Sequence, residues 1–162
     1  MARVEPSGVS FCPMSSTITR SQLLVLAIAY LGWVFDLMDV FLMVLVRDRA
    51  MTELLGPGAS PQSVGVWGGW ALGITLIGWS AGGLIFGMVA DRWGRTRTMA
   101  LTILIYSVFT AACGFAQNVW QLAVFRILLG IGMGGEWASG AALVSETWPA
   151  EHRGKALGFM QS

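Results

Sequence analysis

Four ionisable residues stand inside long apolar stretches of the sequence, where a charge is rare. Asp36 and Asp39 interrupt the apolar run 23–46, and Arg126 and Glu136 interrupt the run 121–145. A charged side chain at the centre of a membrane helix costs about 2.5–3.5 kcal/mol on insertion scales, so such residues are candidates for function by default. Their types predict chemistry with protons and anions, because carboxylates bind protons and arginine binds carboxylates.

The two aspartates are three residues apart, so they share one face of a helix, which Gly32 and Met43 continue. Two carboxylates on one turn repel each other when both are ionised, which favours a proton on one of them. Arg126 presents a planar fork of donors that suits a bidentate grip on a carboxylate. We therefore expect proton binding at Asp36 or Asp39 to weaken their hold on Arg126 and to free it for an organic anion.

Three of these residues also have a purely structural interpretation. Asp39 could lie beside the outer water layer, and Arg126 could extend its side chain to the outer interface. Glu136 could be a contact between helices, or part of a cytoplasmic gate, instead of a proton carrier. The sequence alone leaves these alternatives open.

The composition decides what kind of surface surrounds this chemistry. Of the 162 residues, 12% are charged and 55% are hydrophobic, whereas a soluble domain carries about a quarter charged residues. So few charges cannot cover a surface that faces water, and most of the outside is expected to face lipid. With one domain's length and no low-complexity tract, the sequence predicts a single all-α integral membrane unit.

Four segments are long enough to cross a membrane, which takes about 20 apolar residues. They are expected at about 22–46, 66–90, 98–116 and 121–145, after an N-terminal tail over 1–21. A fifth apolar run opens at Ala156 and stops at Ser162, so we expect a fragment with four complete spans and the start of a fifth. The first run is too long for the core of a signal peptide, which has about 7–15 residues.

Two of these spans bring the charges to comparable depth. At about 1.5 Å per residue, Asp36 lies about 21 Å along its helix from Gln22, and Arg126 lies about 7 Å from the outer end of its own span. In a hydrocarbon core about 30 Å thick, Arg126 is therefore expected to meet Asp36 or Asp39. Glu136 lies about 15 Å further along the helix and about 80° round it, so we do not expect it to pair with Arg126.

Lysines and arginines in short loops predict the orientation, because they stay on the cytoplasmic side. The tail, the loop after the second span and the loop after the fourth carry them, whereas the turn 117–120 carries no charge. The loop 47–65 has two arginines and is the weakest point of this assignment. We predict a cytoplasmic N-terminus from Arg3, Arg20, Arg92, Arg95, Arg97, Arg153 and Lys155.

Small residues recur at four-residue spacing in the second and fourth spans. Such spacing lets helix backbones approach closely in lipid. We expect it to serve helix packing, with sliding of the spans past their neighbours as the alternative. The pairs are Gly69 with Gly73, Gly78 with Gly82, Gly83 with Gly87, Gly130 with Gly134, and Gly135 with Ser139.

The loop between the second and third spans carries a recognisable motif, Gly-Met-Val-Ala-Asp-Arg-Trp-Gly-Arg-Thr-Arg over 87–97. A loop that is merely basic would explain its arginines but not its glycines and aspartate at fixed offsets. The motif resembles the signature loop of the major facilitator superfamily at every defining position. Those positions are Gly87, Asp91, Arg92, Gly94, Arg95 and Arg97. We expect Gly87 to allow close packing, Gly94 to permit a tight reversal, and Asp91 to accept hydrogen bonds from a basic partner.

A second motif follows the fourth span. Glu146 precedes Arg153 by seven residues, which resembles the Glu-x6-Arg element of sugar and organic-acid porters in the same superfamily. The resemblance implies that these residues pair with the signature loop and latch the cytoplasmic side of the carrier.

The resemblance covers residues from about 31 to 162, and it is closest to the metabolite, sialate and lactate proton symporters. The stretches 30–39 and 126–137 carry it, together with 146–149. It implies part of the N-terminal six-helix bundle of a twelve-helix carrier in the plasma (inner) membrane, whose C-terminal half is missing here. The implied function is symport of a small organic anion with a proton, without a cofactor.

One residue departs from a related pattern. Aromatic-acid porters carry Asp-Gly-x-Asp in the first span, whereas Leu37 stands here in place of the glycine. Because a larger side chain leaves the helix less free to approach a ligand, the sequence favours small carboxylates or sugar acids as substrates.

Other classes of function receive less support. A facilitator or antiporter on the same fold, or an inactive truncated membrane protein, stays open as an alternative; a four-helix exporter would need neither the signature loop nor a fifth span. Nothing predicts an enzyme, a metal site or a nucleic-acid partner. Cys12, Cys113 and His152 stand singly, and Gly132 and Gly134 lie inside an apolar span, not in a phosphate-binding loop.

Overall fold

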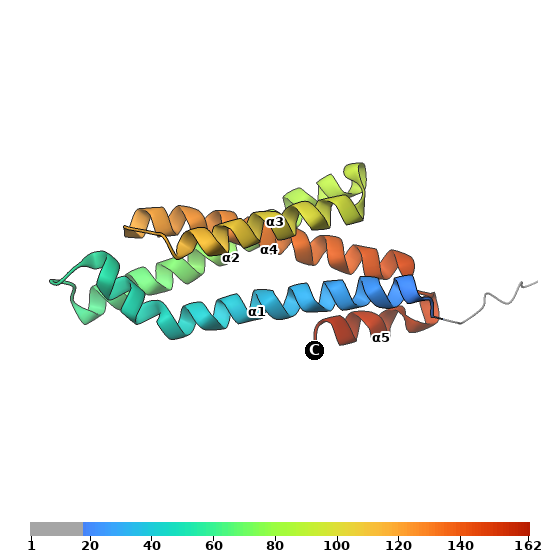
Figure 1. Ribbon diagram of the computed structural model, residues 1–162, viewed down its shortest axis with the longest axis horizontal. Helices are drawn as coiled ribbons and strands as arrows, with labels where there is room; N and C mark the ends of the chain where they lie inside the picture. The colour runs from blue at the N-terminus through green and yellow to red at the C-terminus, as the bar shows by residue number, and fades with distance from the viewer. Residues whose placement is uncertain (1–17) are drawn as a thin grey trace, which may run out of the picture.

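The computed structural model describes residues 18–162, so most of the predicted tail, including Arg3 and Cys12, lies outside the described residues. This part of the chain is helical and contains no strand between 18 and 162, as the all-α prediction requires. Four of its helices are long and apolar enough to cross a membrane. They lie side by side as a bundle, and a short fifth helix turns back along the first (Figure 1). The helices are α1 (Arg20–Leu55), α2 (Pro61–Trp93), α3 (Arg95–Cys113), α4 (Val119–Thr147) and α5 (Ala150–Met160).

Local sequence sets where the helices begin. Thr19 and Gln22 form a capping box at the start of α1, each side chain accepting a hydrogen bond from the other residue's backbone N–H. Ser60 caps α2 ahead of Pro61, and Asn118 caps α4 by accepting from the N–H of Gln121 at 2.8 Å.

The helices do not coincide with the predicted membrane spans. α1 continues to Leu55 through charged turns, where Arg49 and Glu53 form an ion pair at 3.4 Å, because polar residues that have left the hydrocarbon still support a helix. α3 ends at Cys113, before the predicted limit at 116. α5 begins at Ala150, well ahead of 156, because the carbonyl of Pro149 accepts the first N–H groups of the helix.

α4 is the central helix, since it packs against each of the other four. Its contact with α2 brings backbone against backbone: a Cβ added at Gly82 would overlap the carbonyl of Ile131, and one at Gly134 would overlap that of Trp79. These are the close approaches that the four-residue glycine spacing predicts. Gly69 and Gly73 take no part in them, since a Cβ there would meet no described atom within 4 Å.

Two apolar clusters occupy opposite ends of the bundle and leave the middle to polar groups. Outside them, the helices expose many large apolar side chains, which suits a surface that faces lipid. One cluster joins α1, α3, α4 and α5, and contains Leu26, Ala29, Met99, Val144, Trp148, Ala156 and Met160. The other contains Met43, Met51, Val64, Ala71 and Leu122.

Candidate functional site

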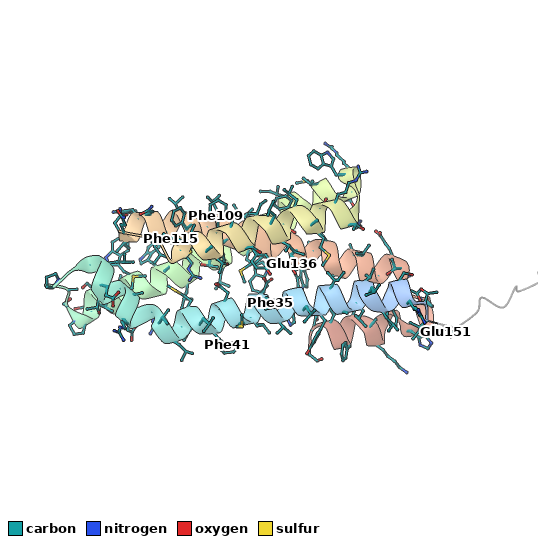
Figure 2. The ribbon with its side chains drawn as sticks, viewed as in Figure 1. Phe35, Phe41, Phe109, Phe115, Glu136 and Glu151 are labelled. Atoms are coloured by element: carbon teal, nitrogen blue, oxygen red, sulfur yellow. The ribbon has the colours of Figure 1, made fainter. Side chains whose placement is uncertain are left out.

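The four charges predicted inside the membrane gather in the middle of the bundle, between the two apolar clusters. Asp36, Arg126 and Glu136 are buried, with 2%, 7% and 3% of their surfaces exposed. Asp39 is largely buried, with 14% of its side chain exposed. Figure 2 shows Glu136 partway along the bundle, on the side of α4 that faces α1, far from Glu151 at the end.

Arg126 pairs with Asp39. Its Nη1 donates to Asp39 Oδ2 at 2.9 Å, and its Nη2 donates to the sulfur of Met43 at 3.1 Å. The depth estimate placed Arg126 beside one of the two aspartates, and the structure brings it to Asp39 and not to Asp36. In this arrangement Arg126 points into the bundle and not toward the outer interface. Its Nε has no hydrogen-bond partner within residues 18–162, so the guanidinium is only partly satisfied.

Asp36 and Glu136 form a separate group. Glu136 reaches across from α4 to α1, where a Cβ at Gly32 would overlap its carboxylate, and Gly32 is one helical turn before Asp36. Both acids line one closed cavity of about 10 Å³, close to the room of a single water molecule. Both oxygens of Glu136 and Oδ1 of Asp36 are buried without a hydrogen-bond partner among the described residues.

The proximity of Asp36 and Glu136 is what the sequence reasoning missed. It paired Asp36 with Asp39 and left the position of Glu136 open. The available signal was Gly32, which continues the face of Asp36 and, having no side chain, leaves space for one from a neighbouring helix. Because a buried carboxylate without a partner is costly, two of them in one cavity favour a proton on at least one.

Two further cavities border the ion pair of Asp39 and Arg126. One of about 390 Å³ lies between α1 and α3 and is lined by Asp39 together with Tyr106, Ser107 and Thr110. The other, of about 630 Å³, is lined by Arg126 together with Thr110 and Gln117. Both volumes lie in the range of small-molecule sites, so a solute could reach this pair.

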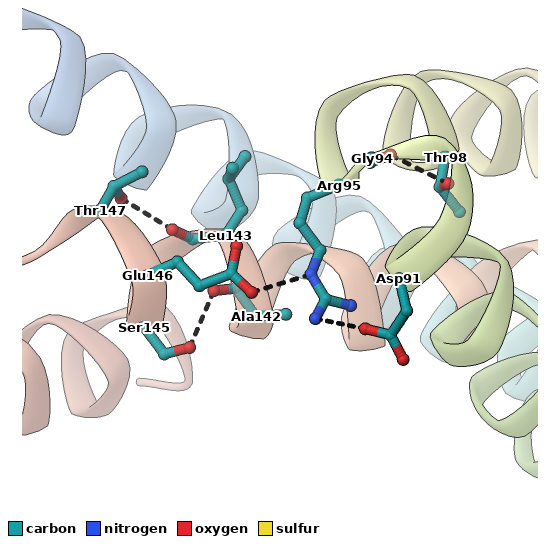
Figure 3. Close-up of polar contacts among 9 residues, drawn as sticks. All are labelled: Asp91, Gly94, Arg95, Thr98, Ala142, Leu143, Ser145, Glu146 and Thr147. Carbon is teal, nitrogen blue, oxygen red and sulfur yellow. Dashed lines mark hydrogen bonds and ion pairs between the residues drawn. The ribbon is translucent and has the colours of Figure 1, made fainter.

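The signature loop forms a polar network at one end of the bundle, drawn in Figure 3. Arg95 donates from Nε to Glu146 Oε1 at 3.0 Å and pairs through Nη2 with Asp91 Oδ1 at 2.6 Å. Gly94 makes the reversal between α2 and α3 with a φ of +91°, a conformation that favours glycine. Asp91, Gly94, Arg95 and Glu146 thus take the positions that the two motifs imply.

Other residues of the two motifs stand apart from this network. Arg92, Arg97 and Arg153 are exposed and make no ion pair within residues 18–162, and Arg153 lies on α5 instead of in a loop. The close packing expected at Gly87 is absent from the described part of the chain, where a Cβ would meet nothing within 4 Å.

The same end of the bundle holds a link that the sequence reasoning did not foresee. Gln22 Nε2 donates to the carbonyl of Thr147 at 2.7 Å, and Trp148 Nε1 donates to the carbonyl of Gln22 at 3.3 Å. The end of α4 is therefore held from two sides, by the signature loop and by the start of α1. Among residues 18–162, no group of three or more His, Cys, Asp or Glu is placed to hold a metal ion.

Comparison with known proteins identifies the family. The Major Facilitator Superfamily model matches residues 23–162, so the chain belongs to this superfamily. It is similar to the niacin transporter NiaP of Acinetobacter baylyi, with 41% identity over 137 residues, which are 82% of this chain and 28% of that protein. It is also similar to the sialic acid transporter NanX of Escherichia coli, with 34% identity over 134 residues, 83% of this chain and 31% of that protein. The gallate transporter of Pseudomonas putida is 29% identical over 143 residues, 88% of this chain and 30% of that protein. No solved structure gives a significant match.

These comparisons confirm the resemblance drawn from the signature loop. With four helices suited to crossing a membrane, the chain is a multi-pass membrane protein. The relatives that the chain matches are named as transporters. The chain spans about three tenths of the length of these relatives.

Proposed function

We propose that the chain is part of a secondary transporter that carries a small organic anion together with a proton by alternating access. The observation that carries this proposal is the separation of the buried charged residues into an ion pair, Asp39 with Arg126, and an acidic pair, Asp36 with Glu136. The relatives are named for niacin, sialic acid and gallate, all of which are carboxylic acids. The remaining helices of the carrier complete the site, which lies near the midplane in transporters of this kind.

Arg126 is the group that would hold the anion. It is the buried cation of the described residues, it borders a cavity of about 630 Å³, and its Nε is free to donate. A substrate carboxylate in place of Asp39 would accept two parallel hydrogen bonds from the guanidinium. When the anion binds, Arg126 would therefore exchange the carboxylate of Asp39 for that of the substrate. The buried guanidinium would keep a negatively charged partner throughout.

Asp36 and Glu136 are the groups that would carry the proton. Each lies without a cation beside it in the described part of the chain, and the cavity between them has room for about one water molecule. A proton arriving from water would bind a carboxylate oxygen and leave from the same oxygen on the other side of the membrane. This assignment modifies the role expected of Asp39, which here pairs with Arg126 until the anion replaces it and does not carry the proton.

The network of Asp91, Arg95 and Glu146 would act as a latch at the end of the bundle that we place on the cytoplasmic side of the plasma (inner) membrane, together with the N-terminus. Arg20, Arg92, Arg95 and Arg97 lie at this end, as the positive-inside rule requires of a cytoplasmic face. Exposed ion pairs contribute about 0–1 kcal/mol each, which allows them to form and break within a transport cycle.

The test is uptake of radiolabelled organic acids by the full-length carrier in proteoliposomes with an imposed pH gradient. We expect accumulation when the outside is acidic, and its loss in Arg126→Gln but not in Arg49→Gln, whose side chain is exposed at the far end of α1. Uptake that does not respond to the gradient would indicate a facilitator or antiporter on the same fold. If no organic acid were taken up, the proposal would be wrong, whether or not sugars were transported.

A further inference from the structure

A pocket lined by three tryptophans lies beside the acidic pair. It has a volume of about 610 Å³ and takes Trp33 from α1, Trp79 from α2 and Trp137 from α4. The rings of Trp33 and Trp79 have centroids 6.0 Å apart and planes inclined by 43°. The volume is in the range of pockets that bind small molecules.

The tryptophan pocket shares two of its lining residues with the cavity of Asp36 and Glu136. Gly83 and Gly134 line it, so the backbone is bare between the indoles. Trp33 and Trp137 also line the closed cavity of Asp36 and Glu136. These two indoles therefore lie between an open pocket that carries three indoles and a smaller, more enclosed cavity that carries two carboxylates.

We propose that this pocket binds the planar ring of the transported acid, an inference that rests on the proposed function and narrows its substrate class. Indole faces favour offset or tilted contact with another flat ring, at centroid distances of about 4.5–7 Å. A puckered ring of the same size touches an indole with fewer atoms. A pocket lined by three indoles and two glycines should therefore bind flat rings more tightly than puckered ones.

The tryptophan pocket is separate from the cavities around Arg126. Trp33 precedes Asp39, the partner of Arg126, by six residues, which is a rise of about 9 Å and a rotation of about 120° round α1. Neither Arg126 nor Asp39 lines the tryptophan pocket. The indoles would therefore contact the ring of the acid from a different face of α1 than the one that carries Asp39.

Leu37, the residue that disfavoured an aromatic acid in the sequence, lies outside the tryptophan pocket. Leu37, which stands where aromatic-acid porters have glycine, is exposed on the surface of α1 and does not line the tryptophan pocket. It therefore leaves the approach of a ligand to Trp33 unobstructed.

The experiment is equilibrium binding to the purified full-length carrier. The planar probes are benzoate, nicotinate and 4-hydroxybenzoate; the matched puckered probe is cyclohexanecarboxylate, and lactate has no ring. At least one planar acid is expected to bind about 10-fold more tightly than cyclohexanecarboxylate. Trp79→Ala is expected to remove most of this ratio and Trp79→Phe to retain it. Trp70→Ala, on an exposed part of α2, is the control and leaves the ratio unchanged.

Each other outcome overturns the inference in a distinguishable way. Equal binding of planar and puckered acids, or binding of lactate alone, would reject the ring site and leave the proposed organic-acid transport standing. A ratio that Trp79→Ala leaves intact, with the variant merely less stable, would mean that the tryptophans pack against another helix of the carrier. If no acid in the set bound, both the ring site and the organic-acid proposal would fall.

Discussion

The end and the middle of the bundle use the same chemistry, arginine with carboxylates, in opposite surroundings. At the end, Asp91 and Glu146 have 63% and 54% of their side chains exposed around Arg95. In the middle, the side chains of Arg126 and Asp39 are 8% and 14% exposed. An exposed pair contributes about 0–1 kcal/mol, whereas breaking a buried pair costs about 3–5 kcal/mol. The ion pairs of Arg95 can therefore break by thermal motion. The ion pair of Arg126 with Asp39 should break only when another charged group replaces one of the partners.

The largest effect is expected from breaking the buried pair. Arg126→Ala leaves Asp39 buried without a cation, which lowers the free energy of unfolding by about 3–5 kcal/mol. Thermal unfolding of the purified carrier in detergent measures this. The double variant with Asp39→Ala is the control and should recover much of the loss; a double variant no better than the single one would contradict the account.

An intermediate effect is expected at the contact of α2 with α4, which holds the middle in place. The Cβ of Gly134→Ala overlaps the carbonyl of Trp79, and overpacking of this kind lowers the free energy of unfolding by about 1–3 kcal/mol. Gly65→Ala, near the start of α2, meets no described atom within 4 Å and should be neutral or stabilising. Equal melting temperatures of the two variants would show that the backbones are not in close contact.

The smallest effect is expected at the exposed end. Arg95→Ala removes both ion pairs of the network and should lower the free energy of unfolding by about 1 kcal/mol or less. The loss should shrink further at high salt, because salt screens exposed charges. Melting curves at two salt concentrations check this, with Arg92→Ala as the control. A loss comparable to that of Arg126→Ala would erase the contrast between the two regions.

The sequence predicted the helices and the signature loop because both depend on local pattern. Apolar length indicated the spans, and the motif predicted Gly94 in the reversal and a basic partner, left unnamed, for Asp91. Helix depth also placed Arg126 at the level of the two aspartates, without choosing between Asp36 and Asp39. The contact of Glu136 with the face of Asp36 depends instead on how α1 and α4 are tilted and in register, which no local pattern encodes. The same limit applies to the three tryptophans, which come from three helices and share a pocket only after packing.

The central claim is that the two buried groups have separate tasks, and exchange transport tests it most directly. Counterflow of a labelled organic acid needs the anion site, whereas accumulation driven by a pH gradient also needs a proton to bind and leave. The account predicts that Asp36→Asn combined with Glu136→Gln keeps counterflow and loses accumulation, while Arg126→Gln loses both. If the acidic double variant still accumulated the substrate against its gradient, the claim that Asp36 and Glu136 carry the proton would be contradicted.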